Sequence, residues 1–480
     1  MPFDKTKAIT ALEHIIGAKH VISDPSDMAS CLTDWRGDYQ GKALAVVRPA
    51  NTSEVSAILQ CADALNMAVI PQGGNTSLCG GATPDDQDNN LILSTERLNA
   101  IRDIDVAGQT ITVESGCILD VIKSTATEHD LLFPLDLGAR GTCRIGGNLS
   151  TNAGGLNVIR YGNMRDLTLG LEVVLMGGKV MNLLSSLKKN NTGYDLKNLF
   201  IGAEGTLGVI TAATLKLFPR PKAIATGFAG LRDIDAGIEL LNRCQAASGG
   251  NVIAFELMPR SIIENVLHFY PDCQPPLNDI PPFSALIEIA STADADQHPD
   301  PDGGMPLTAI LTQTLADALE SGLITDATIA SNQAQQDALW AIRELTPESE
   351  IKAGKAYKSD ISIPLRHMAA FYADAVTAVH AIAPDARIFG FGHIGDGNLH
   401  FNLCEPVGGN ADFRRHYPDF DVIMLDLLKT YEGSISAEHG IGQKKRDMLR
   451  AAKDPIALEV MQTIKQALDP KNLMNPGKVI

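Results

Sequence analysis

The sequence has little of what membrane-spanning, nucleic-acid-binding and disulfide-rich proteins need. No apolar run reaches the roughly 18–20 residues of a membrane-spanning helix. Positive charge is scarce, since 40 Lys and Arg stand against 57 Asp and Glu, and the net charge of −17 argues against nucleic acid or an anionic membrane as the main partner. No C-x-x-C pair occurs, which argues against a thiol metal site and a disulfide framework. We expect reduced, mostly buried thiols at Cys31, Cys61, Cys79, Cys117, Cys143, Cys244, Cys273 and Cys404.

What remains is the composition of an ordinary globular protein. The 480 residues are 45% hydrophobic and 20% charged, and this length predicts two or three domains. Residues 1–17 place charged side chains among apolar ones at helical spacing, which predicts a short amphipathic helix and lacks the apolar core of a signal peptide. We therefore expect a cytoplasmic protein.

Glycine is unevenly distributed along the chain. Three glycine-rich stretches precede residue 210, at 73–81, 138–155 and 202–208. Asn51 and Glu54 form a capping-box pattern that opens a helix with apolar residues at helical spacing. The motif FPRP at 218–221 breaks the chain and predicts domains at 1–221 and 222–420, followed by a helical segment at 421–480. The runs that predict strands are 43–47, 68–71, 91–94, 110–113, 252–257, 285–289 and 387–392.

The first glycine stretch has the chemistry of a pyrophosphate-binding loop. Glycine leaves the backbone accessible and permits the positive φ angles that turn successive N–H groups toward one anion. The run PQGGNTSLCGG at 71–81 follows a predicted strand and adds hydroxyl and amide donors. A Rossmann fingerprint, G-x-G-x-x-G opening a helix, is absent. Taken alone, the run is equally compatible with a flexible surface loop.

Two more stretches follow the first in a recognisable order. The second stretch consists of PLDLGARGT at 134–142, IGGNLSTNAGG at 145–155 and RYG at 160–162. The third consists of TGYDL at 192–196 and IGAEGTLGVI at 201–210. Together with the first loop they resemble the FAD-linked oxidases of the vanillyl-alcohol oxidase and p-cresol methylhydroxylase superfamily. The resemblance implies an α+β fold: a two-part FAD-binding domain at 1–221, an α+β substrate (cap) domain at 222–420, and a helical segment at 421–480 that returns to the flavin domain and completes the active site.

The resemblance also implies how the cofactor is bound. The first loop has no His but does contain Cys79, and the similarity to the glycolate and D-lactate branch implies non-covalent FAD. The residues implied to contact FAD are Pro71, Gly73, Gly74, Asn75, Thr76, Ser77, Pro134, Asp136, Gly138, Gly141, Thr142, Gly146, Gly147, Asn148, Ser150, Thr151, Asn152, Gly154, Gly155, Arg160, Tyr161, Gly162, Glu204, Gly205, Gly208, Val209, Ile210 and Asn475.

The carboxy-terminal part carries two histidines that can converge. The run RIFGFGHIGDGNLHFNLC at 387–404 predicts strand, turn and strand, so His393 can approach His400, and alternation puts His400 and Asn402 on one face. Two imidazoles suit Zn or a similar divalent ion, although ordinary packing or a surface pair gives the same pattern. A third ligand can come from Glu438 or His439, whose side chains diverge because they are adjacent.

These segments resemble the carboxy-terminal domain of D-lactate dehydrogenases, the glycolate oxidase flavin subunit and D-2-hydroxyglutarate dehydrogenases. Carried over, His393, His400 and Glu438 hold the metal, and His439 is the catalytic base. The residues implied to bind substrate are Arg343, Lys358 and Asn402. The two basic side chains could instead be helix-surface charges. One departure concerns a hydroxyl residue that often follows the Arg by one helical turn, where this chain has Pro347, with Thr346 beside it facing elsewhere.

The resulting expectation is an FAD-dependent, metal-assisted dehydrogenase. The substrate is a small D-2-hydroxy acid, with D-2-hydroxyglutarate and D-lactate leading; its hydroxyl gives a proton to His439 and its α-hydrogen leaves as hydride to the flavin. A separate acceptor, such as an electron-transfer flavoprotein, a quinone or a cytochrome, takes the electrons, no nucleic acid is expected, and homodimerisation is left open. The alternatives are an oxygen-reactive glycolate-type oxidase and a flavin-free metallohydrolase or metal-binding protein.

Overall fold

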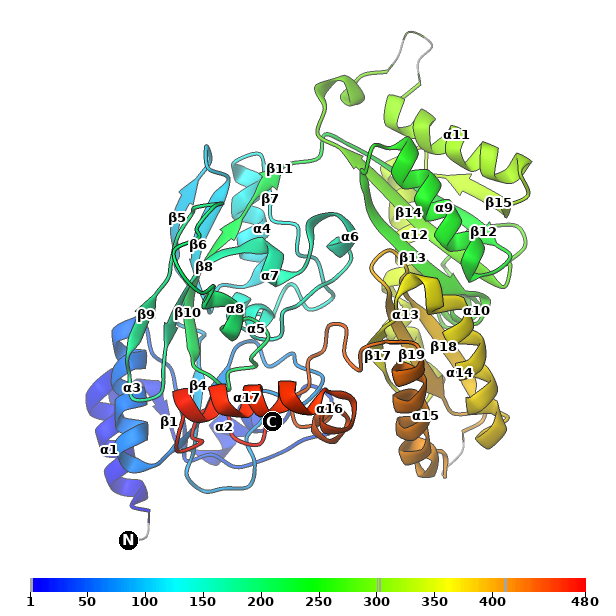
Figure 1. The fold of residues 1–480 in the computed structure, drawn as a ribbon. Helices are drawn as coiled ribbons and strands as arrows, with labels where there is room; N and C mark the ends of the chain where they lie inside the picture. The colour runs from blue at the N-terminus through cyan, green and yellow to red at the C-terminus, as the bar shows by residue number, and fades with distance from the viewer. Residues whose placement is uncertain (1–2, 300, 302–303, 410–411) are drawn as a thin grey trace. The chain divides into compact units, whose positions relative to one another are not determined.

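The computed structural model describes residues 3–299, 301, 304–409 and 412–480, and it divides into two compact units (Figure 1). The first unit comprises Met1–Gly155, Gly162–Pro219 and Glu438–Ile480, and the second comprises Leu156–Tyr161 and Arg220–Ala437. The second unit therefore includes a short insertion from the amino-terminal half, and the first unit includes the carboxy terminus. The domain boundaries at 221 and 420 stay a prediction.

Three sheets build the first unit. A four-stranded sheet has the order β1-β2-β4-β3, and its strands are parallel except that β1 and β2 are antiparallel. A five-stranded antiparallel sheet has the order β5-β6-β10-β8-β9. The third sheet is the antiparallel pair of β7 and β11. The strands are β1 (Val21–Ile22), β2 (Ala45–Val47), β3 (Ala68–Gln72), β4 (Asn90–Ser94), β5 (Ile101–Asp105), β6 (Thr110–Glu114), β7 (Leu131–Leu132), β8 (Thr168–Val174), β9 (Val180–Asn182), β10 (Val209–Lys216) and β11 (Phe218–Pro219).

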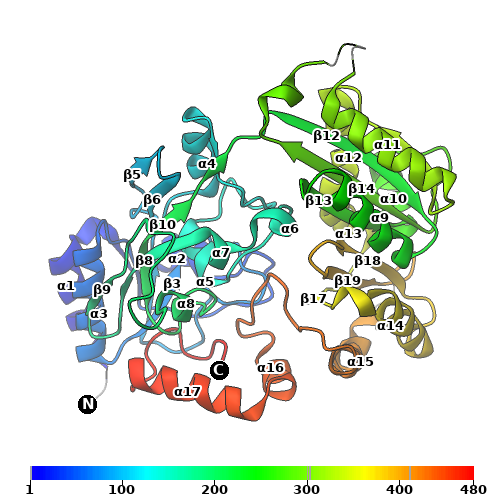
Figure 2. The same ribbon diagram turned by 45° about the horizontal axis from the view of Figure 1, so that its top comes forward.

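Two long helices pack side by side on the four-stranded sheet, as Figures 1 and 2 show for α1 and α3. The predicted amino-terminal helix is confirmed as α1, which buries Ala8, Leu12 and Ile16. The predicted capping is also confirmed, because the Asn51 side chain accepts a hydrogen bond from the Glu54 N–H at 2.9 Å. The helical segments of this unit are α1 (Lys5–Ile16), η1 (Ala18–His20), α2 (Pro25–Leu32), α3 (Thr52–Leu65), α4 (Leu119–Glu128), α5 (Ile145–Ser150), α7 (Met164–Leu167), α8 (Lys197–Phe200), α16 (Arg446–Ala452) and α17 (Pro455–Leu468).

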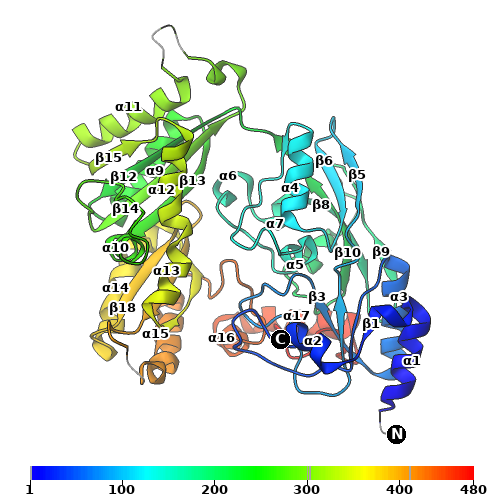
Figure 3. The same ribbon diagram turned by 180° about the vertical axis from the view of Figure 1, so that it is seen from behind.

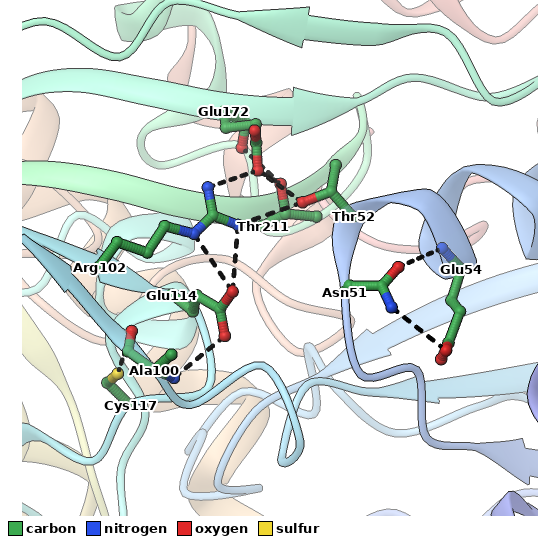
Figure 4. A network of polar contacts seen from close by, with 9 residues as sticks. All are labelled: Asn51, Thr52, Glu54, Ala100, Arg102, Glu114, Cys117, Glu172 and Thr211. Carbon is green, nitrogen blue, oxygen red and sulfur yellow. Dashed lines mark hydrogen bonds and ion pairs between the residues drawn. The ribbon is translucent and has the colours of Figure 1, made fainter.

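A network of charged side chains joins the five-stranded sheet to the start of α3 (Figure 4). Arg102 on β5 pairs with Glu114 on β6 at 3.2 Å and with Glu172 on β8 at 3.1 Å. Glu172 also accepts hydrogen bonds from Thr52 at 2.6 Å and Thr211 at 2.8 Å. Burial by itself raises the pKa of Glu172, but these hydroxyl donors and the charge of Arg102 outweigh burial and hold the pKa below its ordinary value.

One eight-stranded antiparallel sheet organises the second unit. Its order is β15-β12-β14-β13-β18-β19-β16, with β17 pairing beside β16 on β19. The strands are β12 (Ala223–Leu231), β13 (Val252–Pro259), β14 (Phe283–Ser291), β15 (Ile324–Ile329), β16 (Ala356–Tyr357), β17 (Asp360–Ser362), β18 (Arg387–His393) and β19 (Asn398–Cys404). The helical segments are α6 (Val158–Tyr161), α9 (Ile234–Ala247), α10 (Arg260–Phe269), η2 (Asp294–Gln297), α11 (Pro306–Glu320), α12 (Gln333–Glu344), α13 (Thr346–Ala353), η3 (Leu365–His367), α14 (Met368–Ile382), η4 (Phe413–His416) and α15 (Tyr417–Thr430).

Helices cover both faces of this sheet. Gly227 on β12 faces Leu311 and Leu315 of α11, while the next residue, Phe228, belongs to a core with residues of α10 and α12. Figure 1 shows α9 and α11 in front of the sheet, and Figure 3, from behind, shows α12 and α13 on the other side. The face under α12 and α13 carries the polar residues described below.

The predicted strands are all present, and most extend beyond the predicted bounds. The interval 285–289, for example, is the middle of β14, which runs from Phe283 to Ser291 and pairs with β12 along its whole length. All eight cysteines are free and five are buried, as expected. Among the described residues, no helix combines the length and the apolar character needed to cross a membrane.

Candidate functional site

The first glycine loop begins where β3 ends, at the edge of a buried parallel pair. The side chain of Gln72 donates to the carbonyls of Cys31 at 2.9 Å and Ala82 at 3.0 Å, which ties the start of the loop to its end. Asn75, at φ 53°, donates both amide hydrogens to the carbonyls of Ser30 and Thr33. The loop is thus held in place by hydrogen bonds from its own side chains to neighbouring backbone carbonyls.

Four consecutive backbone donors of this loop have no protein partner among the described residues. In the described part of the chain, the N–H groups of residues 74–77 donate no hydrogen bond to any protein group. Consecutive N–H groups left without partners in a glycine-rich turn form a concave site for an anion. This is the arrangement that a pyrophosphate needs, so the loop fits the group that the sequence predicts there.

The second glycine stretch packs against the first. A Cβ on Gly74 would collide with the carbonyl of Thr142 and lie 3.0 Å from the Cα of Cys143, so only glycine allows this approach. A Cβ on Gly147, in contrast, would meet no described atom within 4 Å although the residue is half-buried. Beside it, the buried Oδ1 of Asn148 has no hydrogen-bond partner among the described groups. An open space and an unused polar atom thus lie next to the loop, as a bound cofactor requires.

The third stretch and the carboxy-terminal tail complete this region of the first unit. The N–H of Glu204 donates to the carbonyl of Ser150 at 2.8 Å, and the Glu204 carboxylate accepts from the N–H groups of Ile441 and Gly442, both at 2.7 Å. Burial raises the pKa of Glu204, which these donors oppose. Asn475 donates to the carbonyls of Glu204 at 2.7 Å and Gly81 at 2.9 Å. The tail therefore returns to the glycine loops, as predicted.

Several predicted cofactor residues have other partners in the structure. Asp136 pairs with Lys123 at 2.8 Å and with Arg140 at 3.3 Å. Arg160 and Tyr161 lie on α6 in the second unit, where Arg160 donates to the carbonyl of Ala290 at 2.7 Å. Whether these residues contact FAD stays a prediction, as do the individual contacts of the other predicted cofactor residues.

The two histidines of the second unit converge as the hairpin register predicts. Phe391 on β18 pairs with His400 on β19, and the imidazole rings of His393 and His400 lie 5.8 Å apart in an edge-to-face arrangement. Phe401, between His400 and Asn402, packs against Phe371 of α14 on the opposite face. The predicted alternation along β19 is therefore confirmed, and both imidazoles lie on the face under α12 and α13.

Carboxylates surround each imidazole. Nε2 of His393 lies 3.7 Å from the carboxylate of Glu256 on β13, and its Nδ1 lies 3.7 Å from Asp396 in the hairpin turn. Nδ1 of His400 lies 3.7 Å from the carboxylate of Asp360 on β17. Imidazole nitrogens and carboxylate oxygens together are a donor set that zinc and similar divalent ions accept.

Arg343 is buried beside this group. Its Nε donates to Glu256 at 2.5 Å, its Nη2 lies 3.4 Å from Nε2 of His393, and its guanidinium stacks over the ring of Phe391 at 5.1 Å. We name the set formed by His393, His400, Glu256, Arg343, Asp360 and Asp396 the histidine cluster.

The other two predicted substrate residues meet at one carboxylate. Glu350 on α13 accepts a hydrogen bond from Lys358 Nζ at 2.7 Å with one oxygen and from Asn402 Nδ2 at 2.8 Å with the other. Glu350 is 1% exposed. Asn402 is two residues from His400 on the same face of β19, about 7 Å along the strand. This trio of Glu350, Lys358 and Asn402 therefore borders the histidine cluster.

Sequence reasoning missed Glu256, Asp360 and Glu350 as site residues. Glu256 carried the clearest signal, because it interrupts the apolar run VIAFELMP of β13, where a buried carboxylate needs a partner. Glu350 has no such signal, since it lies in a polar helical segment and its burial depends on tertiary packing.

Glu438 and His439 open the last segment of the first unit, directly after Ala437, where the second unit ends. Within the second unit, Ser434 forms an antiparallel bridge with Ser362, and the Ala437 N–H donates to the carbonyl of Asp360 at 3.4 Å. The chain thus runs beside β17 as far as Ala437. The roles predicted for Glu438 and His439 stay predictions.

Comparison with known proteins gives close relatives over nearly the whole chain. The chain is 38% identical over 486 residues to D-2-hydroxyglutarate dehydrogenase, mitochondrial, of Bos taurus, covering 98% of this chain and 83% of the relative. It is 35% identical over 472 residues to D-2-hydroxyglutarate dehydrogenase of Xanthomonas citri pv. viticola, covering 98% of this chain and 96% of the relative.

The expected cytoplasmic location is wrong on this comparison. The similar proteins from Bos taurus, Rattus norvegicus, Danio rerio and Arabidopsis thaliana are all named mitochondrial, which points away from the cytoplasm. The expectation rested on the composition of residues 1–17. Most of that segment is the packed helix α1, so its pattern reflects core packing and carries no information on compartment.

Family models identify the class of protein, and solved structures show the same fold. A model described as FAD linked oxidases, C-terminal domain, matches residues 220–479, and one described as FAD binding domain matches residues 43–184. The fold is similar to that of substrate-bound p-cresol methylhydroxylase, with a TM-score of 0.75 at 14% identity, covering 99% of this chain and 96% of that one. The protein therefore belongs to the FAD-linked oxidases and is an FAD-binding oxidoreductase with the two-domain fold of p-cresol methylhydroxylase.

Proposed function

We propose that this protein is a metal-assisted dehydrogenase that oxidises a D-2-hydroxy acid to the 2-oxo acid and passes the α-hydrogen as hydride to FAD. The observation that carries the proposal is the pair of imidazoles, His393 and His400, held 5.8 Å apart among buried carboxylates in a member of an FAD-binding family. The names of the relatives, D-2-hydroxyglutarate dehydrogenases, support the substrate class. D-2-hydroxyglutarate and D-lactate are the leading substrates.

FAD is bound by the three glycine stretches and the tail of the first unit. The unused N–H groups of residues 74–77 suit the pyrophosphate, and the open space beside Gly147 suits another part of the cofactor. Because the chain resembles the glycolate and D-lactate branch, the binding proposed here is non-covalent. We also propose the domain boundaries predicted from the sequence, with the flavin domain ending at 221.

A divalent cation, with zinc as the first candidate, is held by His393, His400 and Glu438. Imidazole nitrogens and carboxylate oxygens are the donor types that such an ion accepts, and the charge around the two histidines in the second unit also favours a cation. Four carboxylates stand against two basic side chains there: Glu256, Glu350, Asp360 and Asp396 against Arg343 and Lys358. A divalent cation offsets this excess of negative charge, which is otherwise costly at low exposure.

His439, Arg343 and Asn402 each have a defined part in the proposed reaction. Bound FAD supplies the hydride acceptor, and a bound divalent cation lowers the pKa of the substrate hydroxyl. His439 accepts the hydroxyl proton, a role that suits an imidazole at neutral pH. Arg343, on the same sheet face as the two imidazoles, orients the substrate carboxylate, and Asn402 contacts the substrate beside His400.

The reduced flavin then needs a separate electron acceptor. An electron-transfer flavoprotein, a quinone or a cytochrome has the chemistry to take the two electrons one at a time or together. The alternative is an oxidase, in which the reduced flavin reacts with oxygen and releases hydrogen peroxide. A turnover assay in air that yields no hydrogen peroxide would exclude this alternative.

An anaerobic flavin-reduction screen tests the proposal. The purified holoenzyme is mixed with matched D- and L-2-hydroxy acids and the absorbance of oxidised flavin is followed. Bleaching by D-enantiomers, with the 2-oxo acid as product, is the expected result. A flavin that no D-2-hydroxy acid reduces contradicts the proposed function.

A further inference from the structure

Both basic side chains assigned to substrate carboxylates are already paired with buried carboxylates. Arg343 pairs with Glu256, which is fully buried, and Lys358 pairs with Glu350, which is 1% exposed. The two pairs differ in position. The Arg343–Glu256 pair touches His393, where the reacting end of a 2-hydroxy acid binds in the proposed function, whereas the Lys358–Glu350 pair lies further along β19.

Glu350 is fixed in this position by its helix. The neighbouring Ser349 accepts a hydrogen bond from Asn265 of α10 at 2.9 Å and donates to the carbonyl of Thr346 at 2.8 Å. Both oxygens of Glu350 are occupied, one by Lys358 and one by Asn402. The carboxylate therefore stays between the two side chains that a distal substrate group would have to use.

The turn between α12 and α13 provides no replacement for these donors. The hydroxyl of Thr346, the first residue of α13, donates to the carbonyl of Ile342 in α12 at 3.1 Å. Pro347 has neither a backbone N–H nor a hydroxyl. In the described structure the polar groups of this turn thus serve the fold, and a second substrate carboxylate gains no donor from them.

We propose that Glu350 is a specificity-determining residue that makes the site select 2-hydroxy monocarboxylic acids with an uncharged side chain over 2-hydroxy dicarboxylic acids. A distal carboxylate that approached Lys358 would come within a few ångströms of the Glu350 carboxylate, and like charges at such a distance disfavour each other. A neutral side chain avoids this repulsion and leaves both hydrogen bonds of Glu350 intact. The inference rests on the proposed function, and it separates this chain from relatives named for a dicarboxylate.

The test compares two substrate classes on the holoenzyme. The values of kcat/KM are measured for D-lactate and D-2-hydroxybutyrate and for D-2-hydroxyglutarate, with an artificial electron acceptor. We expect the monocarboxylates to be favoured by about tenfold or more in the wild-type protein. Preference of the wild-type protein for D-2-hydroxyglutarate overturns this inference but leaves the proposed function standing. Failure of every D-2-hydroxy acid to reduce the flavin overturns the proposed function itself.

Variants of Glu350 then identify the cause. Glu350→Gln keeps the shape and one acceptor oxygen for Lys358, and its amide N–H can donate to Oδ1 of Asn402 once the Asn402 amide turns over. The flavin spectrum and the melting temperature are measured to confirm folding. We expect the variant to shift the selectivity ratio toward D-2-hydroxyglutarate by about tenfold or more, mainly through KM. The matched control is Glu344→Gln, the same change at an exposed position on α12, which leaves the ratio unchanged. An unchanged ratio in Glu350→Gln overturns the inference, and the wild-type ratio decides alone if that variant does not fold.

Discussion

The glycine loops of the first unit and the histidine cluster of the second use opposite means to prepare a site. In the loops the polar groups directed to a ligand are backbone N–H groups of residues 74–77, which have no partner in the described chain. In the cluster they are charged side chains, and nearly every one already faces another charge. The loops offer unused donors to an anion, whereas the cluster carries an excess of carboxylates that the proposed cation would offset. We therefore expect substitutions in the loops to weaken FAD binding and substitutions in the cluster to impair metal binding and turnover.

The largest effect is expected from His400→Ala in the cluster. Loss of an imidazole ligand removes the metal, and kcat falls by more than about 100-fold, while the flavin stays bound because the glycine loops lie in the other unit. Metal content by elemental analysis, flavin absorbance and kcat are measured together. His298→Ala, at an exposed position of the second unit, is the matched control. A metal-free His400→Ala enzyme with normal turnover contradicts the role of the metal.

A change in the loops should have the converse effect. A Cβ on Gly147 meets no described atom, so Gly147→Leu is expected to fold normally yet bind FAD at least about tenfold more weakly, because the side chain occupies cofactor space. Gly74→Ala, whose Cβ collides with the Thr142 carbonyl, loses both stability and flavin. The melting temperature of the apoprotein and an FAD titration distinguish the two. If Gly147→Leu binds FAD as tightly as the wild-type protein, the cofactor does not occupy the space beside Gly147.

The first unit also contains charged side chains that serve the fold alone, in the network of Figure 4. Arg102→Met leaves Glu114 and Glu172 without their cation, and we expect the free energy of unfolding to fall by about 1–3 kcal/mol. The comparison is Arg48→Met, which breaks a more exposed pair with Glu96 and costs about 0.5 kcal/mol. Urea denaturation measures both. Equal losses would show that burial of the network contributes nothing.

The smallest effect is a pH dependence of the same network. Because the folded-state pKa of Glu172 lies below its ordinary value of 4.5, its contribution to stability is fully present above that pH and is lost as the pH falls through the lowered pKa. Thr211→Val removes one donor and brings the folded-state pKa closer to its ordinary value, so the acid-side loss of stability should be smaller and should end at a higher pH. The melting temperature is measured from neutral pH down to the pH at which the protein unfolds. The control is Thr214→Val on the same strand, whose hydroxyl pairs with Thr112 and not with Glu172. Identical pH profiles contradict this assignment.

The features that the sequence predicted are those set by local rules. The cap of α3, the hairpin that joins His393 to His400 and the alternation along β19 each depend on neighbours in the chain. The glycine stretches were predicted because glycine leaves the backbone accessible and permits the positive φ angles that an anion-binding turn needs.

The partners within the cluster required tertiary structure. Arg343 meets Glu256 across 87 positions of sequence, and Glu350 meets Asn402 across 52. No periodicity brings these residues together, because their contact depends on how α12 and α13 pack on one face of the sheet. The placement of Arg160 in the second unit has the same origin, since α6 leaves the glycine stretch to join a different sheet.

The most direct test of the account is anaerobic reduction of the holoenzyme flavin by paired D- and L-2-hydroxy acids, before and after removal of divalent metal by a chelator. The account predicts that the D-enantiomer alone bleaches the flavin, that chelation slows bleaching by more than about 100-fold, and that added zinc restores it. Bleaching at the same rate in the metal-free enzyme, or by the L-enantiomer equally, would contradict the account.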